Sequence, residues 1–241
     1  MVICILGVVF AITSMVCWLI GSQNVPPKFV LNPNDLGVIR AVDQPWWRRY
    51  GDLVHGRKYM MLTFDDGPAD RETNETILNV LKKHHAHAVF FTVCKNAMNA
   101  EGAENLKAVV AAGNILGNHT LTHSRLSEMT PDAVEREVVD CQKVLTDITG
   151  REVKLFRPPW GQHSSVLVDI LKKHQLKEVL WLANSGDTWL HAPDKINALT
   201  VSEVSDNCIV LMHSNAVEAR ALDRSLTLLE EQGYEFVLAE E

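Results

Sequence analysis

Residues 61–68 read Met-Leu-Thr-Phe-Asp-Asp-Gly-Pro, and the rest of the chain is best understood outward from this stretch. The apolar run that begins at Tyr59 predicts a buried strand, which the Gly-Pro pair ends abruptly. Asp65 and Asp66 therefore lie at the end of a strand, where two adjacent carboxylates repel unless a proton or a cation neutralises one of them. Taken alone, the same residues also fit an ordinary Asp-Gly turn.

The composition is that of a globular protein with one large or two small domains: 241 residues, 46% of them hydrophobic and 22% charged. The formal net charge is −7, and no run of lysine and arginine occurs. Both features argue against non-specific binding to nucleic acid, which needs a basic surface. No feature of the sequence indicates a protein partner.

The first 21 residues carry no charged side chain, and about 20 apolar residues can span the hydrocarbon core of a membrane. A signal peptide would have a basic start, which is missing, and residues 18–21 (Trp-Leu-Ile-Gly) make a poor cleavage site. We therefore expect a single-pass, uncleaved membrane anchor at residues 1–21 and a linker at 22–56, with a buried core helix as the alternative. The nearest cation, Lys28, follows the apolar segment, so the positive-inside rule alone would keep the rest of the chain in the cytoplasm.

The five cysteines are scattered and show no Cys-x-x-Cys spacing. They are Cys4, Cys17, Cys94, Cys141 and Cys208. Such spacing predicts neither a thiolate zinc site nor a disulfide framework. We expect buried thiols that take no part in chemistry.

Short apolar runs alternate with amphipathic segments from residue 58 onward. Predicted strands lie at 59–64, 88–93, 115–117, 153–156, 178–183, 208–212 and 235–238, and predicted helices at 72–85, 104–112, 130–148, 164–174, 197–204 and 219–232. This alternation predicts an α/β fold with a parallel sheet, open or closed into a barrel, and helices outside it. Such folds place their chemistry at the carboxyl ends of the strands.

Two histidines four residues apart, His119 and His123, follow the predicted strand at 115–117. Together with one carboxylate they make a two-histidine, one-carboxylate set of metal ligands, which leaves positions open for water and substrate. Zinc is the commonest choice for hydrolysis, and cobalt, manganese, nickel or iron suit the same ligands. A histidine pair of this spacing alone is more often a surface or core feature, so the interpretation depends on the aspartate pair.

Three further polar groups follow later strands. Arg157 precedes two prolines that fix its direction, and an arginine held in this way can pair with a carboxylate that a metal leaves free. His213 ends the strand at 208–212, and Asp187 follows the strand at 178–183. A carboxylate beside this histidine would set its tautomer and raise its pKa, as a general acid requires. The plainer alternatives are a solvated arginine in a turn and a histidine that simply ends its strand.

Taken in order, these motifs resemble those of the polysaccharide deacetylase family, the NodB-type enzymes of carbohydrate esterase family 4. The motifs are Thr63-Phe64-Asp65-Asp66-Gly67-Pro68, His119-Thr120-x-x-His123, Arg157-x-Pro159-x-Gly161, Asp187 and Leu211-x-His213. The resemblance covers residues 57–241 and implies a deformed (β/α) barrel of parallel strands with outer helices. It also implies metal-dependent removal of N-acetyl groups from amino-sugar polymers.

The resemblance assigns the motif residues to one site. The implied roles are Asp66, His119 and His123 as metal ligands, Asp65 as general base, Arg157 as its orienting partner, His213 as general acid, Asp187 as the residue that tunes His213, and Leu211 as the lining for the acetyl methyl. Trp160, beside the motif arginine, is the tryptophan best placed to stack on a sugar ring. The fourth motif departs from the common family pattern, because Asn184 replaces an aspartate and Thr188 separates Asp187 from Trp189.

The expected function is that of a membrane-tethered deacetylase acting on N-acetylglucosamine in peptidoglycan. Chitin oligomers, or another C–N bond cleaved by a related amidase, are alternative substrates. Such polymers lie outside the cell, so we expect the anchor to place the domain on the extracytoplasmic side. A non-catalytic glycan-binding module ranks lower, as does a magnesium-dependent phosphotransfer enzyme, which would leave the three histidines without a role.

Overall fold

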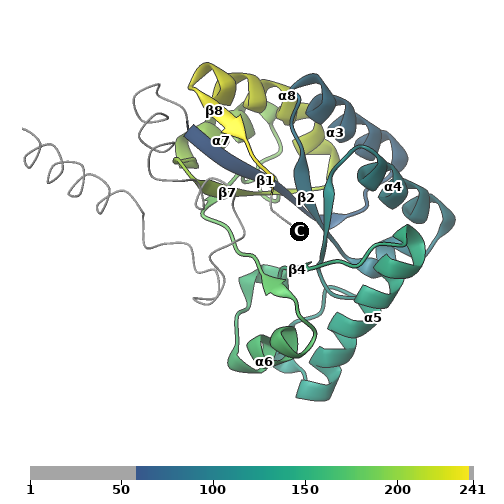
Figure 1. The fold of residues 1–241 in the computed structure, drawn as a ribbon. Coiled ribbons are helices and arrows are strands. Elements are labelled where there is room, and N and C mark those ends of the chain that lie inside the picture. The colour runs from purple at the N-terminus through teal and green to yellow at the C-terminus, as the bar shows by residue number, and fades with distance from the viewer. Residues whose placement is uncertain (1–57, 239–241) are drawn as a thin grey trace, which may run out of the picture.

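The structure is a computed structural model that describes residues 58–238 (Figure 1). Strands and helices alternate along most of this range, as the sequence predicts. No helix within it is long and apolar enough to cross a membrane. The predicted anchor at residues 1–21 and the linker at 22–56 lie outside the described residues.

The strands form one eight-stranded sheet, and every pairing within the described residues is parallel. Their bounds are β1 Lys58–Gly67, β2 Ala88–Thr92, β3 Ile115–Asn118, β4 Leu155–Phe156, β5 Lys177–Glu178, β6 Ala183–Asn184, β7 Cys208–His213 and β8 Tyr234–Phe236. The order is β5-β4-β3-β2-β1-β7-β6, and β8 pairs with β1 beside this path. β1, which carries the aspartate pair, is therefore a central strand.

The helices lie on the outside of the curved sheet (Figure 1). Their bounds are α3 Arg71–Lys83, α4 Ala100–Ala111, α5 Pro131–Thr149, α6 Ser165–Lys173, α7 Pro193–Glu203 and α8 Ala216–Glu231, with 3-10 turns η1 Cys94–Ala97, η2 Leu126–Glu128 and η3 Pro159–Gly161. The result is a half-barrel of parallel strands with outer helices, consistent with the predicted deformed (β/α) barrel.

Local sequence signals account for several helix ends. The Asp70 side chain accepts a hydrogen bond from the Thr73 N–H at 3.0 Å and caps α3, and Asn215 caps α8 in the same way. Gly150 ends α5 in the left-handed conformation, at a φ of 69°. α5 begins with Pro131 at its first position, and the Thr130 side chain before it accepts no capping hydrogen bond although threonine often caps helices.

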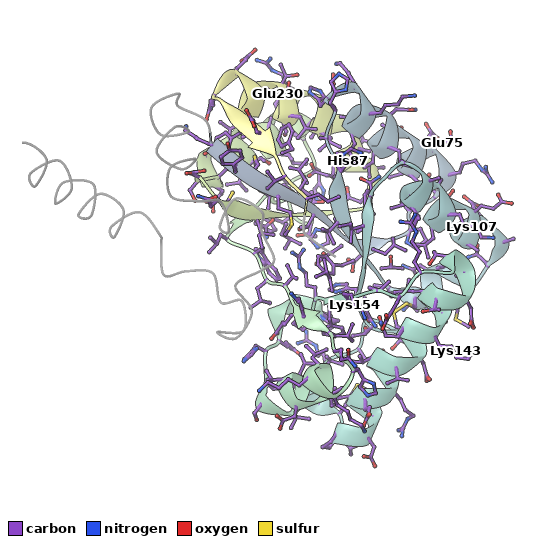
Figure 2. All side chains as sticks on the ribbon, viewed as in Figure 1. Glu75, His87, Lys107, Lys143, Lys154 and Glu230 are labelled. Atoms are coloured by element: carbon purple, nitrogen blue, oxygen red, sulfur yellow. A yellow bond between two sulfur atoms is a disulfide. The ribbon has the colours of Figure 1, made fainter. Side chains whose placement is uncertain are left out.

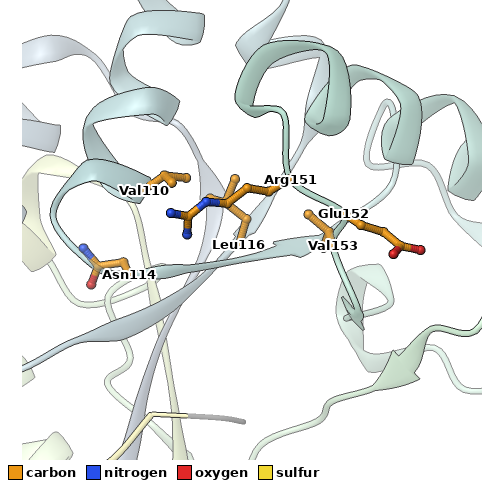
Figure 3. A pocket seen from close by; sticks show the side chains of 6 residues that line it. All are labelled: Val110, Asn114, Leu116, Arg151, Glu152 and Val153. Atoms are coloured by element: carbon orange, nitrogen blue, oxygen red, sulfur yellow. The ribbon is translucent and has the colours of Figure 1, made fainter. Parts of the chain in front are cut away.

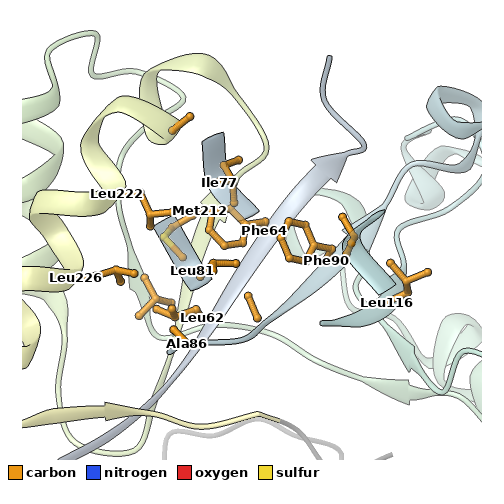
Figure 4. Packing of buried hydrophobic residues seen from close by; sticks show 14 of the residues in the cluster. Leu62, Phe64, Ile77, Leu81, Ala86, Phe90, Leu116, Met212, Leu222 and Leu226 are labelled. Carbon is orange, nitrogen blue, oxygen red and sulfur yellow. The ribbon is translucent and has the colours of Figure 1, made fainter. Parts of the chain in front are cut away.

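Alternate residues of β1 face opposite sides of the sheet. Leu62 and Phe64 belong to the main core beneath α3 and α8, where Phe64 stacks on Phe90 with ring centroids 5.0 Å apart (Figure 4). Met61 belongs to a second apolar cluster on the inner side of the sheet. Side chains fill the space on both sides (Figure 2). Because the period is two, Asp65 shares the inner side with Met61.

The structure corrects the strand predicted at 178–183. It contains two short strands instead: β5 pairs with β4 at one end of the sheet, and β6 pairs with β7 at the other. The residues between them lie against Arg157, whose guanidinium donates to the Val179 and Leu180 carbonyls at 3.0 and 3.4 Å. The apolar run therefore breaks because a buried arginine takes its carbonyl groups.

The prediction for the cysteines is wrong for one pair. Cys94 and Cys141 form a disulfide, with Cα atoms 5.3 Å apart across 47 residues of sequence. The bond joins η1, which follows β2, to the middle of α5, two segments that pack together in the core. Scattered positions in the sequence hide this proximity, because only tertiary packing brings the two segments within bonding distance. Cys208 matches the prediction: it is a free, buried thiol, and burial raises its pKa to about 11.

Candidate active site

The predicted site residues meet at the carboxyl edge of the sheet. Asp65 and Asp66 lie at the carboxyl end of β1, and Asp65 is in register with His213 at the end of the neighbouring β7. His119 directly follows β3, and Arg157 directly follows β4. In a parallel sheet all these strand ends point the same way, so side chains distant in sequence gather at one edge.

Asp66, His119 and His123 form a cluster whose potential ligand atoms all lie within 4.8 Å of one another. Asp66 Oδ1 is 3.6 Å from His119 Nε2 and 3.3 Å from His123 Nε2. Asp66 reaches this position through a left-handed backbone conformation, at a φ of 67°, which turns it away from the ladder of β1. The cluster combines two imidazoles and one carboxylate, the predicted ligand set.

The two histidines come from a tight loop and not from a helix. Thr120 and His123 both have positive φ angles, 69° and 60°, and the His123 N–H donates to Thr120 Oγ1 at 2.9 Å. His119 Nδ1 lies 2.7 Å from the Arg157 carbonyl oxygen, so Nδ1 carries the proton and donates it there. That tautomer leaves the lone pair of Nε2 facing the cluster.

The residues of the cluster fit a divalent cation. Asp66 Oδ1 is buried and has no hydrogen-bond partner within the described residues, although 43% of the side chain is exposed. His119 is 2% exposed, and burial lowers its pKa, which favours the neutral imidazole that a metal requires. A buried acceptor oxygen without a donor, next to two imidazoles, is an arrangement that a cation would satisfy.

Arg157 holds Asp65 through one oxygen. Its Nη1 donates to Asp65 Oδ1 at 2.8 Å and to Thr63 Oγ1 at 2.7 Å, and all three side chains are buried. Burial lowers the pKa of Arg157, and the adjacent Asp65 carboxylate opposes that shift, so the guanidinium keeps its charge. The Phe91 ring packs 4.1 Å from the guanidinium carbon. The Asp65 carboxylate is thereby fixed in direction by a charged hydrogen-bond donor.

Asp187 and His213 form the second pair. His213 Nδ1 lies 2.8 Å from Asp187 Oδ1, and the His213 backbone N–H donates to Asp187 Oδ2 at 2.7 Å. Burial alone would lower the pKa of His213, but the hydrogen bond and charge of Asp187, with the charges of Asp65 and Asp66, outweigh it and raise the pKa. Nδ1 is occupied, so Nε2 is the ring nitrogen left to carry and donate a proton.

The two residues predicted to contact substrate differ in exposure. Trp160 is 50% exposed and packs edge-on against His123, with ring centroids 4.4 Å apart; the Arg125 guanidinium lies 4.7 Å from its ring centre. Leu211 is 4% exposed within β7, in register with Thr63 and Asn184. Trp160 is therefore half exposed beside the cluster, with Arg125 over its ring, whereas Leu211 is buried in the sheet.

Several supporting residues were not predicted from the sequence. The Glu137 carboxylate accepts from the Thr122 N–H and hydroxyl at 2.9 and 2.7 Å, and so holds the loop between the two histidines. Asn215 Nδ2 donates to Asp187 Oδ2 at 2.8 Å. Glu137 left a signal, because it is a charged residue on the apolar, buried face of α5. The sequence gives no signal for Asn215 apart from its position before a predicted helix.

A small hollow elsewhere on the surface is separate from this site (Figure 3). Its lining residues are Val110, Asn114, Leu116, Arg151, Glu152 and Val153. They surround the amino ends of β3 and β4, whereas the clustered carboxylates and histidines lie at the carboxyl ends. The hollow therefore lies at the opposite edge of the sheet from the candidate active site.

Comparison with known proteins agrees with this geometry. The sequence profile described as Polysaccharide deacetylase matches residues 53–179. The chain is 30% identical over 185 residues to the peptidoglycan-N-acetylglucosamine deacetylase PgdA of Listeria monocytogenes. The matched region covers 76% of this chain and 38% of the Listeria protein. A family 4 carbohydrate esterase from Streptomyces lividans, solved in complex with acetate, matches at a TM-score of 0.67 and 30% identity over 73% of this chain and 90% of that one. A protein of Bacillus anthracis described as a CE4 family pseudoenzyme matches at a TM-score of 0.70 and 28% identity over 75% and 63%.

The chain belongs to the polysaccharide deacetylase family, and the predicted membership of carbohydrate esterase family 4 is confirmed. The chain spans 38% of the length of the Listeria protein. The family includes both enzymes and a pseudoenzyme, so membership by itself does not decide whether this chain is active; that depends on its own residues.

Proposed function

We propose that this protein is a metal-dependent hydrolase that removes N-acetyl groups from an amino-sugar polymer, with the N-acetylglucosamine of peptidoglycan as its substrate. The observation that carries the proposal is the three-part edge of the sheet: the Asp66–His119–His123 cluster, the Asp65–Arg157 pair and the Asp187–His213 pair. A cation site, an oriented base and a tuned acid are the parts that amide hydrolysis needs. The Listeria relative, a peptidoglycan-N-acetylglucosamine deacetylase, supports the choice of polymer.

Asp66, His119 and His123 would hold a divalent cation, with zinc as the first choice and cobalt, manganese, nickel or iron suited to the same ligands. When bound, the cation would supply Lewis acidity toward a water molecule and the amide carbonyl. Asp65 accepts the proton of the attacking water at Oδ2, because Arg157 occupies Oδ1. His213 donates the proton on Nε2 to the leaving nitrogen, because Asp187 occupies Nδ1. The oxygen–carbon bond forms, the carbon–nitrogen bond breaks, and acetate and a free amine result.

Exposed aromatic groups support a glycan as the substrate. Trp160 is half exposed beside His123, and sugar rings stack on the faces of aromatic rings through their axial C–H groups. We assign Leu211, buried at the floor between β1 and β6, to the pocket that receives the acetyl methyl. Chitin oligomers, and a different amide cut by the same machinery, remain the alternative substrates.

A non-catalytic glycan-binding module is the main alternative of another class. The pseudoenzyme from Bacillus anthracis shows that this fold also occurs without activity. In the present chain the base, acid and ligand positions are all filled by residues of the required type, which favours catalysis. A magnesium-dependent phosphotransfer enzyme is disfavoured, because histidines line the site where that chemistry would use oxygen ligands.

We further propose that residues 1–21 anchor the protein in the cell membrane, that residues 22–56 link the anchor to the domain, and that the domain at 57–241 works outside the cytoplasm. The disulfide between Cys94 and Cys141 supports this side, since such bonds persist in oxidising compartments. Peptidoglycan also lies there. Protease treatment of intact cells should digest the domain; protection in intact cells together with digestion after lysis would contradict the proposal.

Acetate release tests the function directly. The chelated protein is loaded in turn with zinc, cobalt, manganese, nickel and iron, and supplied with peptidoglycan, chitin oligomers and a non-glycan acetamide. We expect release from peptidoglycan that depends on the metal and disappears in Asp65→Asn. Binding of glycan without release of acetate under every loading would instead establish the non-catalytic module.

A further inference from the structure

Glu218 is a buried carboxyl group that the chemistry above does not use. It lies in the first turn of α8 and is 0% exposed. The carboxyl group makes no hydrogen bond of good geometry within the described residues, although the Ser185 hydroxyl lies close to it and the Glu218 backbone N–H donates to Asn215 Oδ1 at 2.9 Å. Buried carboxyl groups are normally paired, so an unpaired one requires an explanation.

The turn that carries Glu218 is tied to the Asp187–His213 pair. Asn215 caps α8 with its oxygen and donates from Nδ2 to Asp187 Oδ2 at 2.8 Å, so one side chain joins the helix start to the pair. Burial raises the pKa of Glu218 to about 8, and the negative charge of Asp187 adds to the shift. The Ser185 hydroxyl and His213 oppose it in part. Glu218 is therefore protonated at neutral pH.

The other charged groups that face α8 come from the strand ends and from the neighbouring helices α3 and α7. From β7 and the loop after β6 come His213 and Asp187, and from the end of β1 come Asp65 and Asp66, which act on His213. On α3, Lys83 and His84 contact Asp223 and Glu230 farther along α8. The contact from α7 is neutral, between Asn197 and Ser225 at 2.8 Å, and the α7 charges Asp194, Lys195 and Glu203 are exposed.

We propose that Glu218 is a positioning residue for the general acid: its buried carboxyl group, in the turn of α8 that Asn215 ties to Asp187, sets the charge against which His213 holds its proton. This inference rests on the proposed role of His213. While Glu218 is neutral, Asp187 alone holds the Nδ1 side of the imidazole. When Glu218 ionises, a second negative charge strengthens the hold of His213 on its proton, and the acid form persists to higher pH.

The substitution Glu218→Gln separates this role from simple packing, because glutamine matches the shape of the neutral carboxyl but never ionises. In the metal-loaded, full-length protein, kcat/KM at pH 6.5 should stay within about twofold of the wild type. In the pH profile of kcat/KM, the alkaline limb should shift to lower pH by about one unit. The value of kcat/KM at pH 9 should then be roughly tenfold below that of the wild type. Glu230→Gln, the same change at the far end of the same helix, should leave the whole profile unchanged.

Two measurements do not require turnover. The His213 imidazole, followed by NMR in the metal-loaded protein, should titrate at lower pH in Glu218→Gln than in the wild type. The melting temperature of the wild type should fall relative to Glu218→Gln as pH rises from 5 to 8. The reason is that the unfolded chain ionises Glu218 near pH 4.5 whereas the folded chain keeps the proton until about pH 8.

Superimposed pH profiles, or an equal loss of kcat/KM at every pH, would show that Glu218 only packs, and the inference would be overturned. If the wild type releases no acetate, the proposed function fails, but the NMR titration and the melting curves still decide the inference. Unchanged titration of His213 in Glu218→Gln would overturn it by itself.

Discussion

The two oxygens of Asp65 have different surroundings. Oδ1 lies 2.8 Å from Arg157 Nη1, whereas Oδ2 lies 3.6 Å from His119 Nε2 and faces the Asp66–His119–His123 cluster. One oxygen therefore holds the side chain in place and the other is left for chemistry. The guanidinium is fully buried and also donates to the Val179 carbonyl at 3.0 Å, so the direction of Asp65 is set by the inner wall of the half-barrel.

Asp65→Asn should lower kcat by roughly 10²- to 10⁴-fold, the usual contribution of a positioned general base. Asparagine keeps the shape and can still accept from Arg157, so the fold and the metal content should stay close to those of the wild type. Acetate release and metal analysis of the same preparation measure both. Loss of the metal together with activity would assign Asp65 to the ligands and contradict its role as base.

Arg157→Gln should destabilise the protein by roughly 3–5 kcal/mol, because it leaves the buried Asp65 carboxylate without its charged partner. Arg151→Gln, which changes an exposed arginine, serves as the control and should shift stability by less than about 0.5 kcal/mol. Urea unfolding of the two variants gives the comparison. Equal stability of Arg157→Gln and the wild type would show that the pair contributes nothing beyond packing.

His123→Ala should remove one of three ligands and abolish stoichiometric binding of zinc. His174→Ala is the matched control, since His174 lies outside the site and contacts Glu135 on the surface. Isothermal titration of the chelated proteins with zinc reads the affinity directly. Added zinc should also raise the melting temperature of the wild type and of His174→Ala, because a ligand that binds only the folded state stabilises it. If His123→Ala binds zinc as tightly as the wild type, the assignment of His123 as a ligand is refuted.

Asp187→Asn should shift the alkaline limb of kcat/KM to lower pH. Asp187 raises the pKa of His213 in the folded protein, so its contribution to stability is full below the unfolded value of about 6.5 and is lost as pH rises through the folded value. The stability difference between the wild type and Asp187→Asn should accordingly be larger at pH 5.5 than at pH 8.5. Asp223→Asn removes a surface carboxylate from another histidine, His84, and should leave the kinetic profile in place. A pH-independent loss of activity in Asp187→Asn would argue for a structural role alone.

Replacing both Cys94 and Cys141 by alanine should cost roughly 4 kcal/mol of stability, as expected for opening a loop of 47 residues. Thermal unfolding with and without a reducing agent measures this. Reductant should lower the melting temperature of the wild type and leave the double variant unaffected. An equal response of the two proteins to reductant would show that the thiols are unpaired in solution. Cys208→Ala, which removes a free thiol, controls for loss of buried volume.

The sequence was sufficient to predict most of the strands and helices along the chain and to predict the family. The apolar run of β1 and the glycines and prolines between segments predict local structure, which depends on short-range backbone and burial preferences. The break between β5 and β6 could not be predicted in this way. It depends on Arg157, which is distant in sequence and takes the Val179 and Leu180 carbonyls.

The sequence by itself determined which residue types stand at the strand ends, because motif spacing is a property of the chain alone. Only the tertiary structure decided which atoms face one another: Nδ1 of His119 toward the Arg157 carbonyl, Glu218 buried in the α8 turn that Asn215 ties to Asp187, and the bond between Cys94 and Cys141. The physical reason is that side-chain direction, tautomer and burial depend on partners far apart along the chain, which come together only when the sheet curves and the helices pack on it.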